Sequence, residues 1–462
     1  MRSALPLLAL MALCACSHAP LTKRYQPPPQ TMFTNAPELA ADTEPVARFW
    51  QRFDDDKLSS LVERALLANT DVRIAAASLA ESRAIGRFAD ADLWPTVNLA
   101  AGAARVRAKD SNGVPKTDNA FSVGLDVLWE VDVFGRLSDA RRAAQAGVLA
   151  GEAGHRAAQL SIAAEVARNY FNLRGLQEQL RVALASLETQ RAALQLVEAR
   201  EGVGRGTALD SERARSLVNS TAASVPAIES ALARTRYRLA VLCGLAPTGL
   251  DAELQDTRPL PGIKPIDIGG IGTPENLLRR RPDVQVAEAQ LAAAAANAGV
   301  ARSAWFPTIT LGGSLGQNAA RAGDIGDGAS YAYNLGAQLA WNLLDFGRIR
   351  ARIAASDARL DAAAAQYERA VLAALEETEG AFITYTRAQQ QAALLYDAVA
   401  ASEKASVIAR ERFAVGSTDF LVVLDAEREL LSARDRLAQA QTNAAGSLVT
   451  VYKALAGGWG SP

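Results

Sequence analysis

The feature that most constrains the fold is an internal repeat, because the chain aligns with itself at one constant offset in residue number. Trp129 aligns with Trp341, and Phe134-Gly135-Arg136 aligns with Phe346-Gly347-Arg348. The same offset pairs Pro95 with Pro307, Asp71 with Asp283, Glu165 with Glu377, Gly204 with Gly416, and Leu209 with Leu421. A register held from residue 71 to residue 421 is not a chance match. Because the period is too long for a solenoid, it predicts one domain duplicated within the chain.

Both repeats have the same predicted order of elements. Repeat 1 covers residues 51–243, repeat 2 covers residues 275–462, and a Pro- and Gly-rich extended connector at 244–274 joins them. The elements of repeat 1 are a helix, a β-hairpin at about 94–134, a long helix, a turn at about 201–209 and a second helix. Those of repeat 2 are a helix, a β-hairpin at about 306–345, a long helix, a turn at about 413–420 and a second helix. A helix of roughly 60 residues would extend about 90 Å.

The strands are predicted from alternating apolar residues. From Phe121 to Val133 every odd-numbered residue is apolar, and the segment from Tyr331 to Leu343 repeats this pattern. Polar stretches at 109–119 and 318–330 are the predicted hairpin loops. The strands are long enough to cross a bilayer at a tilt, although a soluble antiparallel sheet with one wet face would alternate in the same way. Since four strands cannot close a barrel, spanning strands would have to be pooled from two or three copies of the chain.

The N-terminus predicts export. Residues 1–15 contain Arg2 and a short apolar stretch, as in a secretory signal peptide. The sequence Leu13-Cys14-Ala15-Cys16 resembles a bacterial lipoprotein signal, which would make Cys16 the lipid-modified start of an acylated linker at 16–50. An ordinary cleaved signal peptide, or a disulfide between the two cysteines, remains the alternative. The lipoprotein signal favours the membrane interpretation of the strands.

The composition argues against several classes of function. The 49 basic and 50 acidic residues are balanced, so no net field would attract nucleic acid. Two histidines and three cysteines leave little scope for metal or thiol chemistry, and Cys243 is expected to be a packing residue. Gly312–Gly316 fits the hydrolase pattern G-x-S-x-G, but it lies in an alternating strand and the histidines, His18 and His155, lie far from it in the chain. We therefore expect no enzyme activity, no metal and no cofactor other than the lipid on Cys16.

Several motifs together resemble one family. They are LCAC at 13–16, FWQRFDDDKLSSLVERALLANTDV at 49–72, LWEVDVFGR at 128–136, LLRRRPDVQVAEAQL at 277–291, WNLLDFGRIR at 341–350 and GSTDFLVVLDAEREL at 416–430. From Cys16 to its end the chain resembles the TolC-type outer membrane factors, and most of all their OprM/NodT-like efflux lipoprotein branch.

The resemblance implies a mixed α and β membrane protein that forms a homotrimer. Each chain would give four strands to a twelve-stranded β-barrel in the outer membrane of a Gram-negative bacterium, in contact with outer-membrane lipid. A long α-helical coiled-coil tunnel would continue it into the periplasm. The implied function is a passive exit duct for small toxic compounds in a tripartite efflux system. Its partners would be a periplasmic adaptor (membrane fusion) protein and an inner-membrane pump, usually of the resistance-nodulation-division type.

The resemblance also implies a gate at the periplasmic tip, where Gly204 and Gly416 would form the turns. In the OprM branch a Leu, an Asp and an Arg close the channel, and the stretch FLVVLDAER places these roles on Leu421, Asp425 and Arg428. Spacings of four and three residues put all three on one face of a helix. Without the resemblance, a pair of exposed charges on one helix would be the simpler interpretation. Repeat 1 has Leu209 but carries Glu212-Arg213 downstream, so it departs from this pattern.

Two other functions fit part of the pattern. The same scaffold serves as the outer-membrane duct of type I protein secretion, whereas the lipoprotein signal and the motifs favour small-molecule efflux. A lipid-anchored structural coiled coil without a pore would explain the helices but not the two hairpins. The roles of Glu165 and Glu377, and the compounds exported, are not evident from the sequence.

Overall fold

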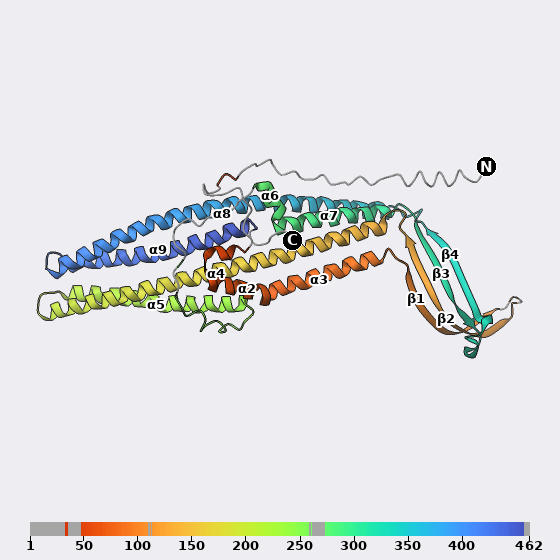
Figure 1. Ribbon diagram of the computed structural model, residues 1–462, viewed down its shortest axis with the longest axis horizontal. Helices are drawn as coiled ribbons and strands as arrows, with labels where there is room; N and C mark the ends of the chain where they lie inside the picture. The colour runs from red at the N-terminus through yellow and green to blue at the C-terminus, as the bar shows by residue number, and fades with distance from the viewer. Residues whose placement is uncertain are drawn as a thin grey trace. The chain divides into compact units, whose positions relative to one another are not determined.

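The computed structural model describes residues 33–35, 48–109, 111, 113–257, 260 and 273–456. The predicted signal peptide and Cys16 lie outside the described residues. The fold is mostly helical, with one four-stranded antiparallel sheet (Figure 1). No helix in the described part of the chain is both long enough and apolar enough to cross a membrane.

The elements recur along the chain. The first series is η2 (Phe49–Phe53), α2 (Asp56–Ala68), α3 (Thr70–Ala91), β1 (Thr96–Lys109), β2 (Pro115–Val131), α4 (Arg136–Gly202) and α5 (Ala208–Leu242). The second series is α6 (Pro274–Arg280), α7 (Pro282–Ser303), β3 (Thr308–Ala319), η3 (Ala322–Asp324), η4 (Gly328–Ser330), β4 (Tyr331–Ala340), α8 (Arg348–Ala414) and α9 (Phe420–Ala454). α4 and α8 each have 67 residues, and α5 and α9 each have 35. The starts of α4 and α8, and those of α5 and α9, are equivalent positions of the sequence repeat.

The chain divides into two compact units. In its described part, the first unit comprises residues 78–152 and 286–369, which include the sheet. Its strands follow the order β1-β2-β3-β4, so β1 and β4 are the edges. A tryptophan in each repeat fixes the start of a strand, because Trp129 Nε1 donates to the carbonyl of Leu93 (2.9 Å) and Trp341 Nε1 donates to that of Trp305 (3.0 Å). Equivalent positions therefore make equivalent contacts.

The register gives the sheet two chemically different faces. One row across the four strands is Asn98, Asp126, Ser314 and Asn334. The adjacent row, on the other face, is Leu99, Leu125, Leu315 and Tyr333. All four apolar side chains of the second row are exposed in the single chain. The alternation in the sequence thus becomes one polar face and one bare apolar face.

The first hairpin is longer than its sequence pattern indicates. The pattern predicts a loop over 109–119, but β2 begins at Pro115, and Lys116 to Asn119 pair with residues of β1. These residues are polar, and β1 and this end of β2 are exposed on both faces. No apolar alternation therefore marks them as strand.

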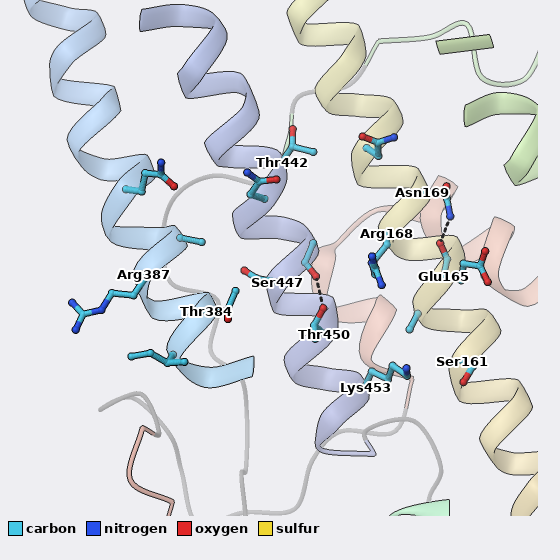
Figure 2. Close-up of a pocket in the computed structure, with 17 residues that line it drawn as sticks. Ser161, Glu165, Arg168, Asn169, Thr384, Arg387, Thr442, Ser447, Thr450 and Lys453 are labelled. Carbon is cyan, nitrogen blue, oxygen red and sulfur yellow. Dashed lines mark hydrogen bonds between the residues drawn. The ribbon is translucent and has the colours of Figure 1, made fainter. Parts of the chain in front are cut away.

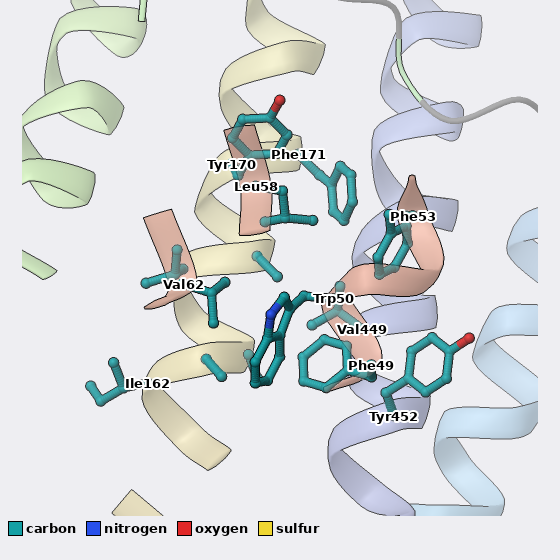
Figure 3. Packing of buried hydrophobic residues seen from close by; sticks show 14 of the residues in the cluster. Phe49, Trp50, Phe53, Leu58, Val62, Ile162, Tyr170, Phe171, Val449 and Tyr452 are labelled. Carbon is teal, nitrogen blue, oxygen red and sulfur yellow. The ribbon is translucent and has the colours of Figure 1, made fainter. Parts of the chain in front are cut away.

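The second unit contains the main hydrophobic core. In its described part it comprises residues 33–35, 48–77, 153–257, 260, 273–285 and 370–456. The aromatic side chains of η2 insert between α4 and α9, where Phe49 stacks on Tyr452 with 5.3 Å between ring centroids (Figure 3). Asp55 caps the N-terminus of α2 and also accepts a hydrogen bond from the Tyr170 hydroxyl of α4. Together, η2 and α2 cover one side of α4 and α9.

Cys243 is a core residue, as its sequence context predicts. It is fully buried, and its Sγ contacts the carbonyl of Leu61 at 3.5 Å. Burial raises the pKa of the Cys243 thiol to about 11, so the reactive thiolate is scarce at neutral pH. The buried thiol is therefore a packing residue of the core.

The RRRPDV motif explains the break between α6 and α7. Arg281 is only 7% exposed, and it bridges the Asp283 and Glu377 carboxylates while donating to the carbonyl of Ala454 at 3.0 Å. At the equivalent position of the first repeat, Asn69 donates to the carbonyl of Leu242 at 2.9 Å. Each break therefore fastens the start of a helix to the end of its repeat's last helix.

Candidate functional site

The turns that end α4 and α8 have the same hydrogen bonds. Gly204 N–H donates to Glu201 and Arg205 N–H to Arg200, while Gly416 N–H donates to Phe413 and Ser417 N–H to Arg412. This is the Schellman arrangement, in which the residue after the helix adopts a left-handed conformation. The φ angles of Gly204 and Gly416 are 73° and 76°. The backbone of both turns therefore favours glycine.

We expect Gly416→Ala to destabilise the protein by about 1–2 kcal/mol, since a Cβ is disfavoured in the left-handed region. No heavy atom of the described residues lies within 4 Å of the Cβ that would be added, so the backbone conformation is responsible. The measurement is the free energy of unfolding from a urea titration. Gly380→Ala is the matched control, because Gly380 lies within α8 with the same open space and should gain about 0.5–1 kcal/mol. Equal effects at the two positions would contradict the turn assignment.

The three predicted gate residues share an exposed face of α9 just after the second turn. Leu421 is 42% exposed, and Asp425 and Arg428 are exposed as well. Within the described chain, the side chains of Asp425 and Arg428 make no hydrogen bond or ion pair. The other face of α9 is buried through Phe420, Val423, Leu424 and Glu427. The structure thus brings the three residues onto one surface and leaves that surface uncovered in the single chain.

The buried face of α9 has a polar contact that the sequence does not reveal. Glu427 is 8% exposed and accepts a hydrogen bond from Ser406 of α8 at 2.7 Å. Arg410, one turn further along α8, lies 3.4 Å from the same carboxylate. This carboxylate joins α9 to α8 directly behind the exposed face. Its burial is visible only once the helices are paired, because its neighbours Arg428 and Glu429 are exposed.

A second contact that the sequence does not reveal joins the two turns. The guanidinium of Arg200, in the last turn of α4, lies 4.2 Å from the ring centroid of Phe413 and donates to the Phe413 and Ala414 carbonyls at 3.2 and 3.1 Å. It therefore caps the end of α8 from the other repeat. An arginine in a last turn indicates a favourable interaction with its own helix. Only the fold shows that Arg200 instead donates hydrogen bonds to the last carbonyls of α8.

The matched glutamates Glu165 and Glu377 are both ion-paired. Glu377 belongs to the Arg281 cluster, while Glu165 accepts hydrogen bonds from Arg238 of α5. Ser314, the central residue of the G-x-S-x-G pattern, is paired on both sides within β3. A hydrolase nucleophile requires a sharp turn between strand and helix, and this serine has none. The described residues also contain no group of three or more His, Cys, Asp or Glu that could hold a metal ion.

Comparison with known proteins adds the family to this geometry. The family model described as outer membrane efflux protein matches residues 61–245 and again residues 273–457. The chain belongs to the outer membrane efflux protein family. The starts of the two matches are related by the same offset as the sequence repeat, so each repeat carries the family's pattern.

Relatives that match over nearly their whole length support this membership. The pyoverdine export outer membrane protein OpmQ of Pseudomonas aeruginosa is 33% identical over 460 residues, which cover 98% of this chain and 95% of the relative. The solvent efflux pump outer membrane protein SrpC of Pseudomonas putida is 30% identical, with 98% of each chain covered. The cation efflux system protein CusC of Escherichia coli is 29% identical, again with 98% of each covered.

Solved structures agree with the fold. The outer-membrane channel OprN is 37% identical and has a TM-score of 0.89 over 96% of this chain and 100% of its own. The open MtrE outer membrane channel of Neisseria gonorrhoeae is 27% identical, with a TM-score of 0.82 over 96% and 98% of the two chains. As a member of the outer membrane efflux protein family, the chain is an outer-membrane efflux channel of a Gram-negative bacterium.

Proposed function

We propose that three copies of this chain form a passive exit duct for small toxic compounds, with a twelve-stranded barrel continued by a tunnel of helices. The observation that carries the proposal is the four-stranded sheet, with two open edges and a bare apolar face opposite a polar one. Open edges are not tolerated in lipid, so a spanning sheet must close by pairing β1 of one copy with β4 of the next. An apolar exterior and a polar interior are the pattern of an outer-membrane barrel.

The two repeats would then provide equivalent halves of each chain's wall, repeat 1 at 51–243 and repeat 2 at 275–462. Leu250 and Leu254, at the start of the predicted connector at 244–274, are buried in the main core, so this part of the connector would belong to the second unit's packing. Cys16 would carry the lipid that anchors the chain beside its barrel. An acyl chain contributes about 0.8 kcal/mol per buried methylene, so several chains together anchor firmly.

The gate would lie on the exposed face formed by Leu421, Asp425 and Arg428. Three Leu421 side chains around an axis would narrow and dewet the passage, and three Asp425 carboxylates would favour cations at the neck. Arg428 would stabilise the closed state through ion pairs with a neighbouring copy. The lack of partners for Asp425 and Arg428 within the described part of one chain supports contacts between chains at this position.

The duct would need partners to supply energy. We propose a periplasmic adaptor and an inner-membrane pump of the resistance-nodulation-division type, consistent with relatives named for solvent and cation efflux. A duct for type I protein secretion is the second candidate from the same scaffold. A structural coiled coil without a pore would leave the apolar face of the sheet without a role.

Conductance in a planar bilayer tests the duct and its gate together. The purified trimer should conduct poorly, and either Asp425→Ala or Arg428→Ala should raise its conductance at least ten-fold, because each removes a charge from the closed ring. Lys404→Ala is the matched control, since Lys404 is an exposed charge of α8 two residues from Ser406, which contacts α9, and therefore lies on the side of α8 away from α9. If both gate variants stay as closed as the parent, these residues do not form the gate.

A further inference from the structure

A groove of about 1140 Å³ runs along α4, α8 and α9 in the second unit. Basic side chains line it from all three helices: Arg168 from α4, Arg387 from α8 and Lys453 from α9. Arg168 projects from α4 toward α9, and Lys453 projects from α9 toward α4 (Figure 2). Most of the remaining lining consists of small polar side chains, among them Asn169, Asn172, Thr384, Gln391, Thr442, Asn443, Ser447 and Thr450.

A second cavity of about 580 Å³ adjoins this groove along α8 and α9. The two cavities share Arg387, Gln391 and Asn443, and the second adds Arg436. We refer to the two cavities together as the basic groove. It therefore holds four cationic side chains from one copy of the chain.

The positive charge of the basic groove is not neutralised from within. Of the described residues that line it, Glu165 is the only carboxylate, and Arg238 already binds it. The side chains of Arg168, Lys453 and Arg436 make no hydrogen bond or ion pair with the described part of the chain. A concave surface with charges of one sign concentrates ions of the opposite sign, because its low-dielectric walls focus the field.

The basic groove lies on a side of the helices that no other described segment of the chain covers. Arg168 is two residues from both Val166 and Tyr170, which are buried in the core under η2 and α2. Two residues along a helix correspond to a rotation of about 200°, so Arg168 leaves α4 on the side away from that core. A duct needs a polar wall that no other segment of the chain covers. The core side, which η2 and α2 cover, does not qualify, whereas the basic groove does.

We propose that the basic groove lines the passage and binds small organic anions, such as compounds that carry carboxylate, sulfonate or phosphate groups. This inference rests on the proposed duct for its place in the wall, but the binding itself can be measured on its own. Three copies would contribute twelve cationic side chains to one belt. Because the groove consists mainly of flexible charges and small polar groups, it selects for negative charge and not for one shape.

The test uses pyranine, a fluorescent dye with three sulfonates, and the full-length trimer in detergent. Fluorescence anisotropy should show that pyranine binds and that cationic ethidium does not. The double variant Arg168→Gln/Lys453→Gln should weaken pyranine binding at least ten-fold, and each single variant should weaken it by a smaller factor. Raising the salt roughly ten-fold, from about 0.05 to about 0.5 M, should also weaken binding, because exposed charges are screened.

Arg191→Gln is the matched control, because Arg191 is an exposed, unpaired arginine of the described α4 that does not line the groove. It should change pyranine binding less than two-fold. The proposal is overturned if the double variant binds pyranine as the parent does, or if ethidium binds equally well. It is also overturned if the single variants dissociate the trimer, since the groove would then be a subunit contact. If the gate variants conduct poorly but pyranine still binds, the proposed duct is refuted, while the proposed anion binding by the basic groove stands.

Discussion

The double variant Asp283→Asn/Glu377→Gln should lose about 3–5 kcal/mol of unfolding free energy, because it leaves the Arg281 guanidinium buried without a counter-charge. Arg281 bonds Asp283 at 3.0 and 2.7 Å and Glu377 at 2.5 Å. Burial alone would lower the pKa of Arg281, but its hydrogen bonds to these two carboxylates raise it above its usual value. Urea titration of the detergent-solubilised protein measures the loss.

Adding Arg281→Met to that double variant should recover much of the lost stability. A methionine removes the unpaired charge and keeps most of the packing volume, and apolar replacements of whole ion clusters are often neutral. The surface control is Glu275→Gln, which breaks an exposed pair with Arg279 and should cost less than about 1 kcal/mol. A triple variant that is no more stable than the double would show that the charges are not the cause.

The same cluster predicts a loss of stability in acid. Burial raises the pKa of Asp283, but the hydrogen bonds and charge of Arg281 outweigh it, so the pKa lies below the usual value. The Asp283 carboxylate therefore stabilises the folded state fully at pH values above the unfolded-state pKa of about 4. This stabilisation is lost as the pH falls through the lower folded-state pKa. In the Asp283→Asn/Glu377→Gln variant this part of the acid sensitivity should be missing.

The sequence predicts the fold well where one periodicity dominates. The constant offset between repeats, the hairpins and the glycine turns follow from local patterns, and the structure has α4 and α8 of equal length with Gly204 and Gly416 in equivalent turns. The first hairpin loop is the exception, since polar residues of β2 pair with β1 without an apolar pattern. A strand exposed on both faces gives no hydrophobic signal to detect.

Contacts between distant segments could not be predicted from the sequence. The RRRPDV motif is recognisable, yet its chemistry depends on Glu377 of α8 and the carbonyl of Ala454, which lie 96 and 173 residues from Arg281. Arg200 likewise acts on the end of α8, where its two carbonyl partners lie 213 and 214 residues away along the chain. Spacing within a helix places Leu421, Asp425 and Arg428 on one face, but only tertiary packing shows that this face is the uncovered one.

A charge on the apolar face of the sheet should impair the channel far more than the same charge on the polar face. Leu315 lies in β3 between Leu125 and Tyr333, and its side chain is 58% exposed in the single chain. If this face meets lipid, Leu315→Arg should cost about 2–4 kcal/mol near the bilayer centre. The expected result is a lower urea midpoint for folding into lipid vesicles. The trimer, seen on a gel as a band whose migration changes on heating, should also be lost.

The control is the adjacent residue. Ser314 lies in the same strand, in the row of Asn98, Asp126 and Asn334, so Ser314→Arg adds the same charge to the face that would meet water. It should cost less than about 1 kcal/mol, since Asp126 of the neighbouring strand provides a carboxylate beside it. In a soluble sheet both faces would meet water or protein. The difference in unfolding free energy between the two variants would then be the same with and without lipid. A large difference between Leu315→Arg and Ser314→Arg that appears only in vesicles therefore requires a membrane barrel. The two variants place the same charge on adjacent residues of one strand, so they differ only in the face that carries it.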